Sequence, residues 1–581
     1  HSLNLTILHN NDFHTHFEPI NVRSSECQSG EQCFGGIART VTKVNDILAQ
    51  QQQEGNGDKV LFLNGGDHFQ GTIWYTFMKW KVVAKFVKLF KHTAMALGNH
   101  EFDDGVDGLL PFVQNVSREL PIVCANIETS GELKDLIKRS IVVERGGKKI
   151  AIIGYITPET AFLARPGNTV KFLDEIESIK KEIANLRQQY NPKDLNIFIA
   201  VGHSGYEKDK EIAAKIPELD VMVGGHTNTF LYTGKAPSIE VPEGEYPVVF
   251  DHGSDGKTLV VQAFAYGKYL GKLNVIFDDN GLITSYSGNP ILLDDSVKED
   301  PEVLSLVKEE SAKIDEYYKT EVGFSHVVLD QMYCREQECN CGNLMADAFV
   351  TYFLDESQVH KNAWNTVPIS IVNGGAVRSS ISMGNITMKS VVSTSPFGNP
   401  IGVLKTKGSS LWKILEHSVS QYKMGGFLQV SGIRYIFDSK QKRLLSVRVR
   451  CGDCPTPTYK DLDQIPIVKH VPVFQPIQQH QESQQMPVYQ KIPVFQKTFP
   501  ETQMNSPEIS MSAQTPQQPM PGQTQLHDQQ QDMNSDYYPN ENMPEESAPE
   551  GQQQQQSQQE SKIDLILSKL RIKPLIKPLF R

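Results

Sequence analysis

Five short apolar segments of this chain each end in a residue of a type that binds metal ions. Short apolar runs bounded by Gly predict buried strands. Ligands of open α/β sheets bind at the carboxyl ends of the strands. Five strand ends that carry Asp, His or Asn therefore predict one metal centre. The segments are LTILHNND, ending at Asp12; KVLFLNGGD, ending at Asp67; AMALGNH, ending at Asn99 and His100; IFIAVGH, ending at His203; and VMVGGH, ending at His226.

The length and charge of the chain narrow its class. At 581 residues it is too long for a single core and suggests about three or four domains. Its formal net charge of −11 gives a nucleic-acid partner no electrostatic support. No apolar run reaches about 18 residues, so no segment is expected to span a membrane. The sequence starts at His1 in strand-like residues, which is typical of a secreted protein whose signal peptide is gone.

The eight cysteines favour an oxidising compartment. Three pairs are close in sequence, Cys27/Cys33, Cys334/Cys339 and Cys451/Cys454, and we expect three small disulfide loops. A zinc site at the last pair is the alternative, but such CxxC elements usually come doubled. Cys124 and Cys341 are left without an assigned partner. Glycosylation triplets support secretion weakly, at Asn4, Asn115 and Asn385.

The chain divides into four regions. Residues 1–295 alternate strands and helices and predict an α/β domain. Residues 296–323 predict an exposed connector helix, and residues 324–466 a second, smaller α/β unit. Residues 467–581 begin with Gln/Pro-rich sequence that contains three repeats of the type Pro-Val-Phe/Tyr-Gln, and we expect this tail to be disordered. Its basic, apolar end allows a weak contact with a membrane surface or a partner, but an unattached end is favoured.

The metal-type motifs, taken in order, resemble those of the calcineurin-like metallophosphoesterases. Their local context, in HNNDFHTHFEP, GDHFQGTIWY, ALGNHEFDDG, GHSGYEKDK and VGGHTNTFLYTG, resembles the 5′-nucleotidase/apyrase family. That family includes ecto-5′-nucleotidases and the salivary apyrases of blood-feeding arthropods. The resemblance covers about residues 3–465 and implies a four-layer α/β metallophosphoesterase domain followed by a nucleotide-binding domain.

The resemblance assigns a role to each residue of the predicted centre. It makes Asp67 the bridge between two divalent ions, with Asp12, His14 and Asn228 on the first ion and Asn99, His203 and His226 on the second. Zinc is the expected ion, with manganese, magnesium and calcium left open. It makes His100 and Asp103 a dyad that stabilises the transition state and assists the leaving oxygen.

Each of these residues also has a structural interpretation. A lone buried Asp or His is more often a hydrogen-bonded core or loop residue than a metal ligand. His14, His203 and His226 are expected to be ligands because all three stand at predicted strand ends, the last two directly after Gly. We expect the neighbouring His9, His16 and His68 to be supporting or surface groups, and Glu101 and Asp104 to be structural. The Gly residues beside the ligands either form turns or let phosphate approach the backbone.

The second unit also resembles the family, with one departure. By position, Arg335 and Arg378 grip the phosphate or ribose, Asn373 contacts the base, and Phe397 stacks on it; core packing is the alternative for Phe397. The family's second aromatic residue and Asn-Gly-Gly-Asp loop have no match, and Phe474 lies nearest to the aromatic position. Without that stacking face we expect base binding weaker by about 1–3 kcal/mol.

The expected function is a secreted, metal-dependent phosphohydrolase that removes the terminal phosphate of extracellular ATP, ADP or AMP. In saliva, removal of ADP would reduce platelet aggregation. The alternative is a protein on the same scaffold that binds nucleotides or a host-cell receptor with little turnover; a structural role driven by the tail is less favoured. The C-terminus does not fit a lipid-attachment signal, so a freely released protein is expected. Preference among the three nucleotides and oligomeric state do not follow from the sequence.

Overall fold

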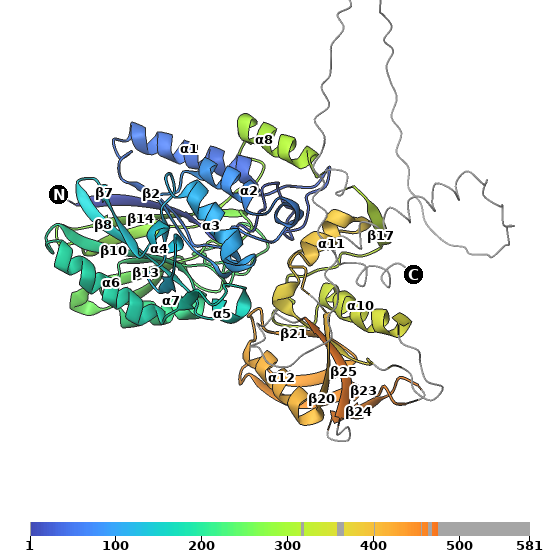
Figure 1. Ribbon diagram of the computed structural model, residues 1–581. Helices are drawn as coiled ribbons and strands as arrows, with labels where there is room; N and C mark the ends of the chain where they lie inside the picture. Colours follow the sequence, from blue (N-terminus) through green and yellow to red (C-terminus); the bar gives the residue numbers. More distant parts are fainter. Residues whose placement is uncertain are drawn as a thin grey trace, which may run out of the picture. The chain divides into compact units, whose positions relative to one another are not determined.

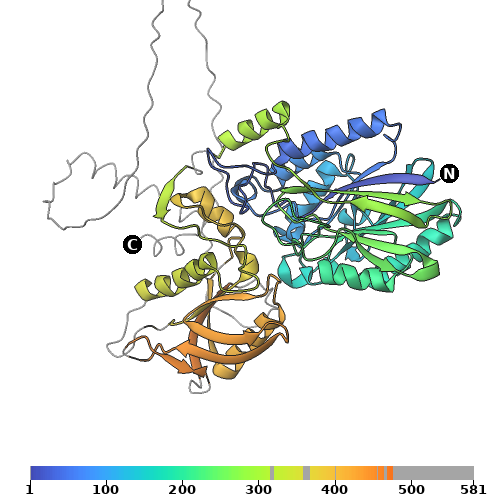
Figure 2. The ribbon, with the colours of Figure 1, turned by 180° about the vertical axis from the view of Figure 1, so that it is seen from behind.

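The computed structural model describes residues 2–314, 319–356, 365, 367–399, 401–454, 456–462 and 467–474, with the backbone alone at 354–356 and 467–474 (Figures 1 and 2). The basic segment at the C-terminus and most of the predicted tail lie outside the described residues. No helix in the described ranges combines the length and apolar character that a membrane crossing requires.

The N-terminal domain is built on two sheets. In the first, the order is β15-β14-β1-β2-β3-β4-β6, with β16 beside β14, and the strands from β1 to β6 are parallel. In the second, the order is β12-β13-β11-β10-β8-β7, with four parallel central strands. The first sheet comprises β1 (Leu3–Asn10), β2 (Val60–Asn64), β3 (Ala94–Ala96), β4 (Ile122–Val123), β6 (Ile137–Lys138), β14 (Tyr269–Phe277), β15 (Ile283–Gly288) and β16 (Ile291–Leu292). The second comprises β7 (Ser140–Arg145), β8 (Lys148–Ile156), β10 (Leu195–His203), β11 (Val221–Val223), β12 (Val248–Asp251) and β13 (Lys257–Val261).

Helices cover the outer face of each sheet (Figures 1 and 2). Against the first sheet lie α1 (Ile37–Gln53), α2 (Ile73–Phe90, with a break at Lys79), α3 (Gly105–Val116) and α8 (Pro301–Ala312). Against the second lie α6 (Glu175–Gln189) and α7 (Tyr206–Lys215). Short elements complete the domain: β5 (Ile127–Thr129), β9 (Val170–Phe172), α4 (Leu133–Leu136), α5 (Thr160–Leu163), η1 (Asn99–Phe102) and η2 (Gly253–Asp255).

Three apolar cores hold these four layers together. Alternate residues of one strand face opposite sides of its sheet. In β1, Ile7 packs between the two sheets, whereas Leu8 packs against the helices of the first sheet. In β10, Ile199 faces the core between the sheets and Phe198 faces α6 and α7. The predicted four-layer α/β domain is confirmed.

Within the described residues, the segment expected as an exposed connector contains the helix α8, which is partly buried. The helix α8 spans only Pro301–Ala312, and β17 already begins at Glu321. Asp300 caps α8 by accepting the N–H groups of Glu302 and Val303, and Pro301 suits its first turn. Val303 and Val307 are buried in the core beside α1 and α2. This segment is therefore anchored to the N-terminal domain along one face.

The second domain combines small sheets with three helices. Its elements are β17 (Glu321–Ser325), α10 (Asn340–Glu356), β18 (Ser370–Asn373), η3 (Gly374–Ala376), β19 (Gly384–Thr387), α11 (Met388–Thr394), β20 (Ile401–Lys407), α12 (Gly408–Ser420), β21 (Leu428–Ser431), β22 (Ile433–Asp438), β23 (Arg443–Arg450), β24 (Tyr459–Asp461) and β25 (Ile467–Phe474). The core packs α12 against the sheet β20-β25-β18-β21 and the sheet β22-β23-β24.

The boundary expected at residue 466 was wrong. The segment 467–474 is the strand β25, which lies between β20 and β18 in the four-stranded sheet. Composition misled the sequence analysis, because the first Pro-Val-Phe-Gln repeat overlaps this strand. The side chain of Phe474, the residue nearest to the family's second aromatic position, lies outside the described residues.

All three expected disulfide loops are present: Cys27–Cys33, Cys334–Cys339 and Cys451–Cys454. The last pair therefore does not form a zinc site. Cys124 and Cys341 are free thiols, and both are buried.

Candidate metal centre

The predicted ligands meet at the carboxyl ends of strands from both sheets. Asp12 follows β1, Asp67 follows β2, and Asn99 follows β3 in the first sheet. His203 is the last residue of β10, and His226 follows β11 in the second sheet. Because the strands within each set are parallel, their carboxyl ends lie on the same edge. The fold thereby brings together side chains that are more than 200 residues apart in sequence.

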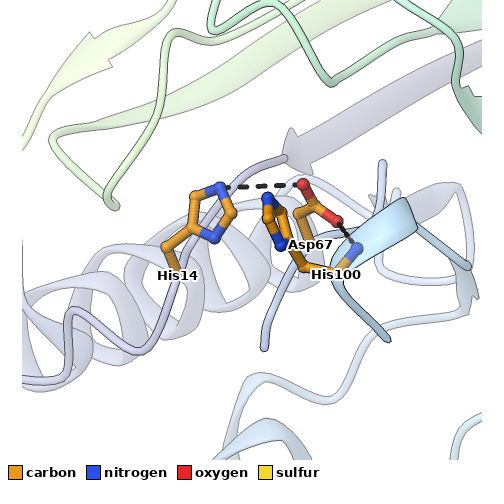
Figure 3. Close-up of side chains that lie close together, drawn as sticks. All are labelled: His14, Asp67 and His100. Atoms are coloured by element: carbon orange, nitrogen blue, oxygen red, sulfur yellow. Dashed lines mark hydrogen bonds and ion pairs between the residues drawn. The ribbon is translucent and has the colours of Figure 1, made fainter. Parts of the chain in front are cut away.

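Asp67 lies at the centre of the cluster. Its Oδ2 is 2.8 Å from His203 Nε2 and 3.7 Å from His14 Nε2. Its Oδ1 accepts the backbone N–H of His100 at 2.9 Å. Figure 3 shows the two carboxylate oxygens of Asp67, one directed to the His14 ring and the other to the backbone nitrogen of His100. A carboxylate in this position can bind two neighbouring cations at once, one on the His14 side and one on the His203 side.

Asp12 is the second carboxylate of the cluster. Its Oδ1 is 3.8 Å from His14 Nε2 and 3.9 Å from His203 Nε2. Its Oδ2 accepts the N–H of His226 at 2.9 Å and the amide of Asn11 at 2.8 Å. One oxygen therefore fixes the carboxylate, and the other faces the imidazoles.

Backbone carbonyls orient two of the imidazoles. The Nδ1–H of His14 donates to Phe69 O at 3.0 Å, and that of His203 donates to Gly65 O at 2.6 Å. Both Nε2 atoms are thus left to face the carboxylates, as metal-ligating histidines require. The third imidazole, His226, has Nδ1 2.9 Å from Asn99 Oδ1.

Most of these residues adopt a backbone conformation that L-residues rarely adopt. Positive φ angles occur at five of the seven predicted ligands. Such angles are uncommon outside Gly and cluster at functional sites, where the surrounding fold maintains them. The five residues are Asp12 (φ 49), His14 (φ 47), Asp67 (φ 59), His226 (φ 80) and Asn228 (φ 58).

Glu101, which we expected to be structural, organises the loop that carries Asp67. Its carboxylate accepts four backbone N–H groups, from Asp67, His68, Phe69 and Gly98, at 2.6–3.1 Å. Burial and the nearby Asp67 raise the pKa of Glu101 to about 7, against the effect of the N–H donors. Gly98 is also required here, because a Cβ at that position would lie 2.1 Å from Asp67 Oδ1. The only signal in the sequence was the position of Glu101 two residues after Asn99.

The donor set fits divalent ions. Two buried oxygens, Asp12 Oδ1 and Asn228 Oδ1, have no hydrogen-bond partner within the described protein. Burial lowers the pKa of His203, but the two carboxylates outweigh this effect and raise it to about 10. A positive charge is therefore stabilised at this point. Two triads have ligand atoms close enough to hold an ion, His14/Asp67/His100 and Asp67/His203/His226. The mixture of imidazole nitrogen and carboxylate oxygen suits zinc or manganese.

The expected dyad is in place. His100 Nδ1 is 2.8 Å from Asp103 Oδ2. Burial lowers the pKa of His100, but Asp103 and Asp67 outweigh this effect and the pKa is raised. Asp103 therefore fixes the ring and favours its protonated form beside the metal cluster.

Two of the four predicted nucleotide-binding residues contact the cluster. The ring of Phe397 stacks on His100, and Arg378 Nη2 is 2.5 Å from His14 Nε2. Arg335 Nη1 is 3.4 Å from the carbonyl oxygen of Thr227, next to His226. Asn373 donates to Gly425 O at 3.3 Å and has no recorded contact with the cluster in the described residues.

The three histidines beside the motifs are buried supports and not surface groups. Burial lowers the pKa of His9 and His68 to about 3 and that of His16 to about 4, so all three are neutral. His9 Nε2 is 2.7 Å from Tyr246 OH, and the ring of His16 packs on Tyr266 at 4.4 Å. Tyr266 in turn contacts His14 and Asn228, a position for which the sequence offered no signal.

Comparison with known proteins agrees with this geometry. Residues 5–230 match the calcineurin-like phosphoesterase family model, which defines a metallophosphoesterase domain. Residues 319–464 match the model of the 5′-nucleotidase C-terminal domain. With this pair of domains, the chain belongs to the 5′-nucleotidase family.

Similar proteins come from several animals. The chain is 41% identical to snake venom 5′-nucleotidase of Crotalus adamanteus over 80% of its length and 79% of the relative's. It is 42% identical to the 5′-nucleotidase of Homo sapiens, over 80% of its own length and 81% of the relative's. It is 39% identical to Protein 5NUC of the sand fly Lutzomyia longipalpis, over 79% and 82%. Among solved structures, the 5′-nucleotidase precursor of Thermus thermophilus has a TM-score of 0.71 at 33% identity, over 81% and 89%.

Proposed function

We propose that this chain is a secreted phosphohydrolase that removes the terminal phosphate of an extracellular nucleotide. Its preferred substrate in this proposal is a nucleoside 5′-monophosphate. The observation that carries the proposal is the buried cluster around Asp67, with the His100–Asp103 dyad beside it. Relatives named 5′-nucleotidases support the choice of a monophosphate.

Seven residues would hold the two divalent ions. We assign Asp12, His14 and Asn228 to one ion, Asn99, His203 and His226 to the other, and Asp67 to both. When bound, two such ions neutralise phosphate charge and lower the pKa of water towards neutrality. Zinc is our proposed ion, on the basis of the three imidazoles.

The remaining residues position the substrate and its protons. His100, held by Asp103, presents a protonated imidazole to the phosphate and protonates the departing ribose oxygen. Arg378 and Arg335 supply guanidinium groups at the edge of the cluster, where a phosphate oxygen accepts them in a fork. Phe397 offers its ring to the purine, and Asn373 lies on the same domain for the base edge.

Three features support secretion. The chain has three disulfides, and the Asn residues of its three glycosylation triplets are exposed. Three of its relatives are venom enzymes by name. An anti-platelet role in saliva requires hydrolysis of ADP, so ADP must be tested beside AMP.

The test is phosphate release from AMP, ADP and ATP by protein dialysed against chelator and then supplied with zinc, manganese, magnesium or calcium. His203→Ala removes a buried ligand, and His417→Ala removes an exposed histidine of α12 as the matched control. We expect metal-dependent release that His203→Ala loses and His417→Ala keeps. Tight nucleotide binding without turnover would instead support the alternative of a binding protein, and no binding would reject both.

A further inference from the structure

The second domain contains a cavity that takes no part in the metal centre. Its volume is about 160 Å³, and β17, α10, β19 and α11 contribute to its walls. Apolar side chains make up most of the lining: Leu329, Leu344, Met345, Ala348, Ile386 and Val391. Phe324 belongs to the wall and is 56% exposed, so its ring lies where the cavity opens to solvent.

Three hydroxyls and one thiol belong to the wall, those of Ser325, Thr394, Ser395 and Cys341, and two of the hydroxyls have partners inside the protein. Ser325 Oγ donates to Val327 O at 2.7 Å, and Thr394 Oγ1 donates to Ser390 O at 2.8 Å. The thiol of Cys341 faces Ser379 O at 3.9 Å. No charged side chain lines the cavity among the described residues. An ion or a strongly polar ligand would therefore lose its hydration and gain at most the Ser395 hydroxyl as a partner.

The size of the cavity limits its ligand. Cavities of about 150 Å³ lined by Leu, Ile and Phe stay dry and bind benzene or xenon, whereas sites for drug-sized ligands are about 300–1,000 Å³. We propose that this cavity binds one uncharged, apolar molecule of about the size of a single aromatic ring, and that its occupancy changes the affinity of the enzyme for nucleotide.

The second half of the proposal rests on two chain segments that the cavity shares with the nucleotide site. Thr394 and Ser395 line the cavity and lie just before Phe397. Ile381 lines it three residues after Arg378. The N–H of Arg378 donates to Thr394 O at 2.9 Å, which joins the two segments directly. A ligand in the cavity therefore touches both segments that carry the predicted nucleotide contacts.

Calorimetric titration with benzene, and with benzoate as a charged probe of the same shape, tests the binding. We expect benzene to bind and benzoate not to bind. Ala348→Leu fills the cavity and should abolish the binding, whereas Met345→Ala enlarges it and should preserve the binding. Failure of benzene to bind the wild-type protein, or equal binding by Ala348→Leu, would overturn the proposal.

Cys341 provides a second measurement that needs no repacked variant. In a Cys124→Ser background it is the remaining free thiol of the eight cysteines. We expect uncharged methyl methanethiosulfonate to form the methyl disulfide there, with release of methanesulfinate, faster than a sulfonatoethyl reagent. Benzene should slow this reaction at least several-fold, as mass spectrometry will show. Equal rates for both reagents, with no protection by benzene, would contradict an apolar site.

The coupling is measured as the KM for AMP with and without saturating benzene. We expect a change of about five-fold or more, the lower end of typical coupling between sites, and no change in Ala348→Leu. An unchanged KM in the wild-type protein would overturn the coupling. The binding and labelling measurements do not use turnover, so they stand even if the proposed function fails.

Discussion

The ring of Phe397 lies parallel to the ring of His100, with an angle of 0° between the planes and 5.0 Å between the centroids. The guanidinium of Arg378 also lies over Phe397, 5.5 Å from its centroid. The aromatic residue that we assign to the purine thus contacts the proposed proton donor and a proposed phosphate-binding arginine. In the proposed function, Phe397 would link purine binding to the His100–Asp103 dyad.

Replacement of Phe397 by Leu should weaken nucleotide binding selectively. Loss of a base–aromatic stack is worth about 1–3 kcal/mol, so the KM for AMP should rise by about 5- to 150-fold. Hydrolysis of p-nitrophenyl phosphate, which has no purine, serves as the control and should keep its kcat/KM. An equal loss with both substrates would show that Phe397 acts through His100 and not through the base.

Glu101→Gln should impair the metal centre without removing a ligand. The amide keeps one acceptor oxygen for four backbone N–H groups, so the loop that carries Asp67 loses its fixed position. Groups that orient metal ligands typically contribute about 10- to 100-fold in metal affinity or activity. Zinc titration and AMP hydrolysis will measure this loss. The exposed Glu119→Gln on the protein surface should match the wild type.

Lys389→Met should destabilise the contact between α11 and the loop at residues 18–26. Lys389 Nζ lies 3.0 Å from Glu18 and 2.9 Å from Glu26, and its side chain is 13% exposed. Hydrogen bonds to charged groups contribute about 1.5–3 kcal/mol, so urea unfolding should show a loss in this range. Lys313→Met is the control, because Lys313 is 52% exposed in its pairs with Glu309 and Glu310 and should lose less.

The free energy of unfolding should fall as the pH rises from about 4 to 7 because of Asp209. Burial raises the pKa of Asp209 from 3.8 to about 7, although Tyr155 and Gln262 donate hydrogen bonds to it. Between these pH values the folded state keeps a proton that the unfolded state has released, so rising pH favours unfolding. This contribution is on the order of 4 kcal/mol.

Urea unfolding at pH 5 and pH 8 measures the effect of Asp209. In Asp209→Asn this group no longer titrates, so the difference between the two pH values should shrink. Asp107→Asn, at an exposed position of α3, should keep the wild-type difference. An unchanged difference in Asp209→Asn would show that the carboxyl ionises normally in the folded protein.

Truncation should separate the folded part from the tail within a few residues. A chain of residues 1–478 keeps β25 and should retain AMP hydrolysis and the wild-type unfolding transition. A chain of residues 1–466 lacks the strand between β20 and β18, so its second domain should not fold. Activity measurements and far-UV circular dichroism distinguish the two. Loss of activity in the longer chain would assign a role to residues beyond 478.

The residues that the sequence assigned to a metal centre lie close together because most of them stand at strand ends. Asp12, Asp67 and His203 each lie at the end of a buried apolar run. Parallel strands place their carboxyl ends on the same edge of the sheet, independently of the conformation of the loops. Glu101 was expected to be structural, but its four backbone contacts depend on loop geometry that no local pattern encodes. The same holds for Tyr266, which was not recognised as a support. The strand β25 was missed for a different reason: its pairing partners lie far away in sequence, and its own composition resembles the tail. The helix α8 ends at Ala312, inside the segment expected as a connector, whose residues 315–318 lie outside the described part of the chain.

The position of β25 also bears on how the protein is made. A sheet whose central strand comes last along the chain cannot close until residue 474 has left the ribosome, whereas the sheets of the first domain are complete by Leu292. Domains generally fold in order during synthesis. At least 107 residues follow Phe474 (581 − 474), so translation of the tail gives the second domain time to assemble while the nascent chain is still tethered.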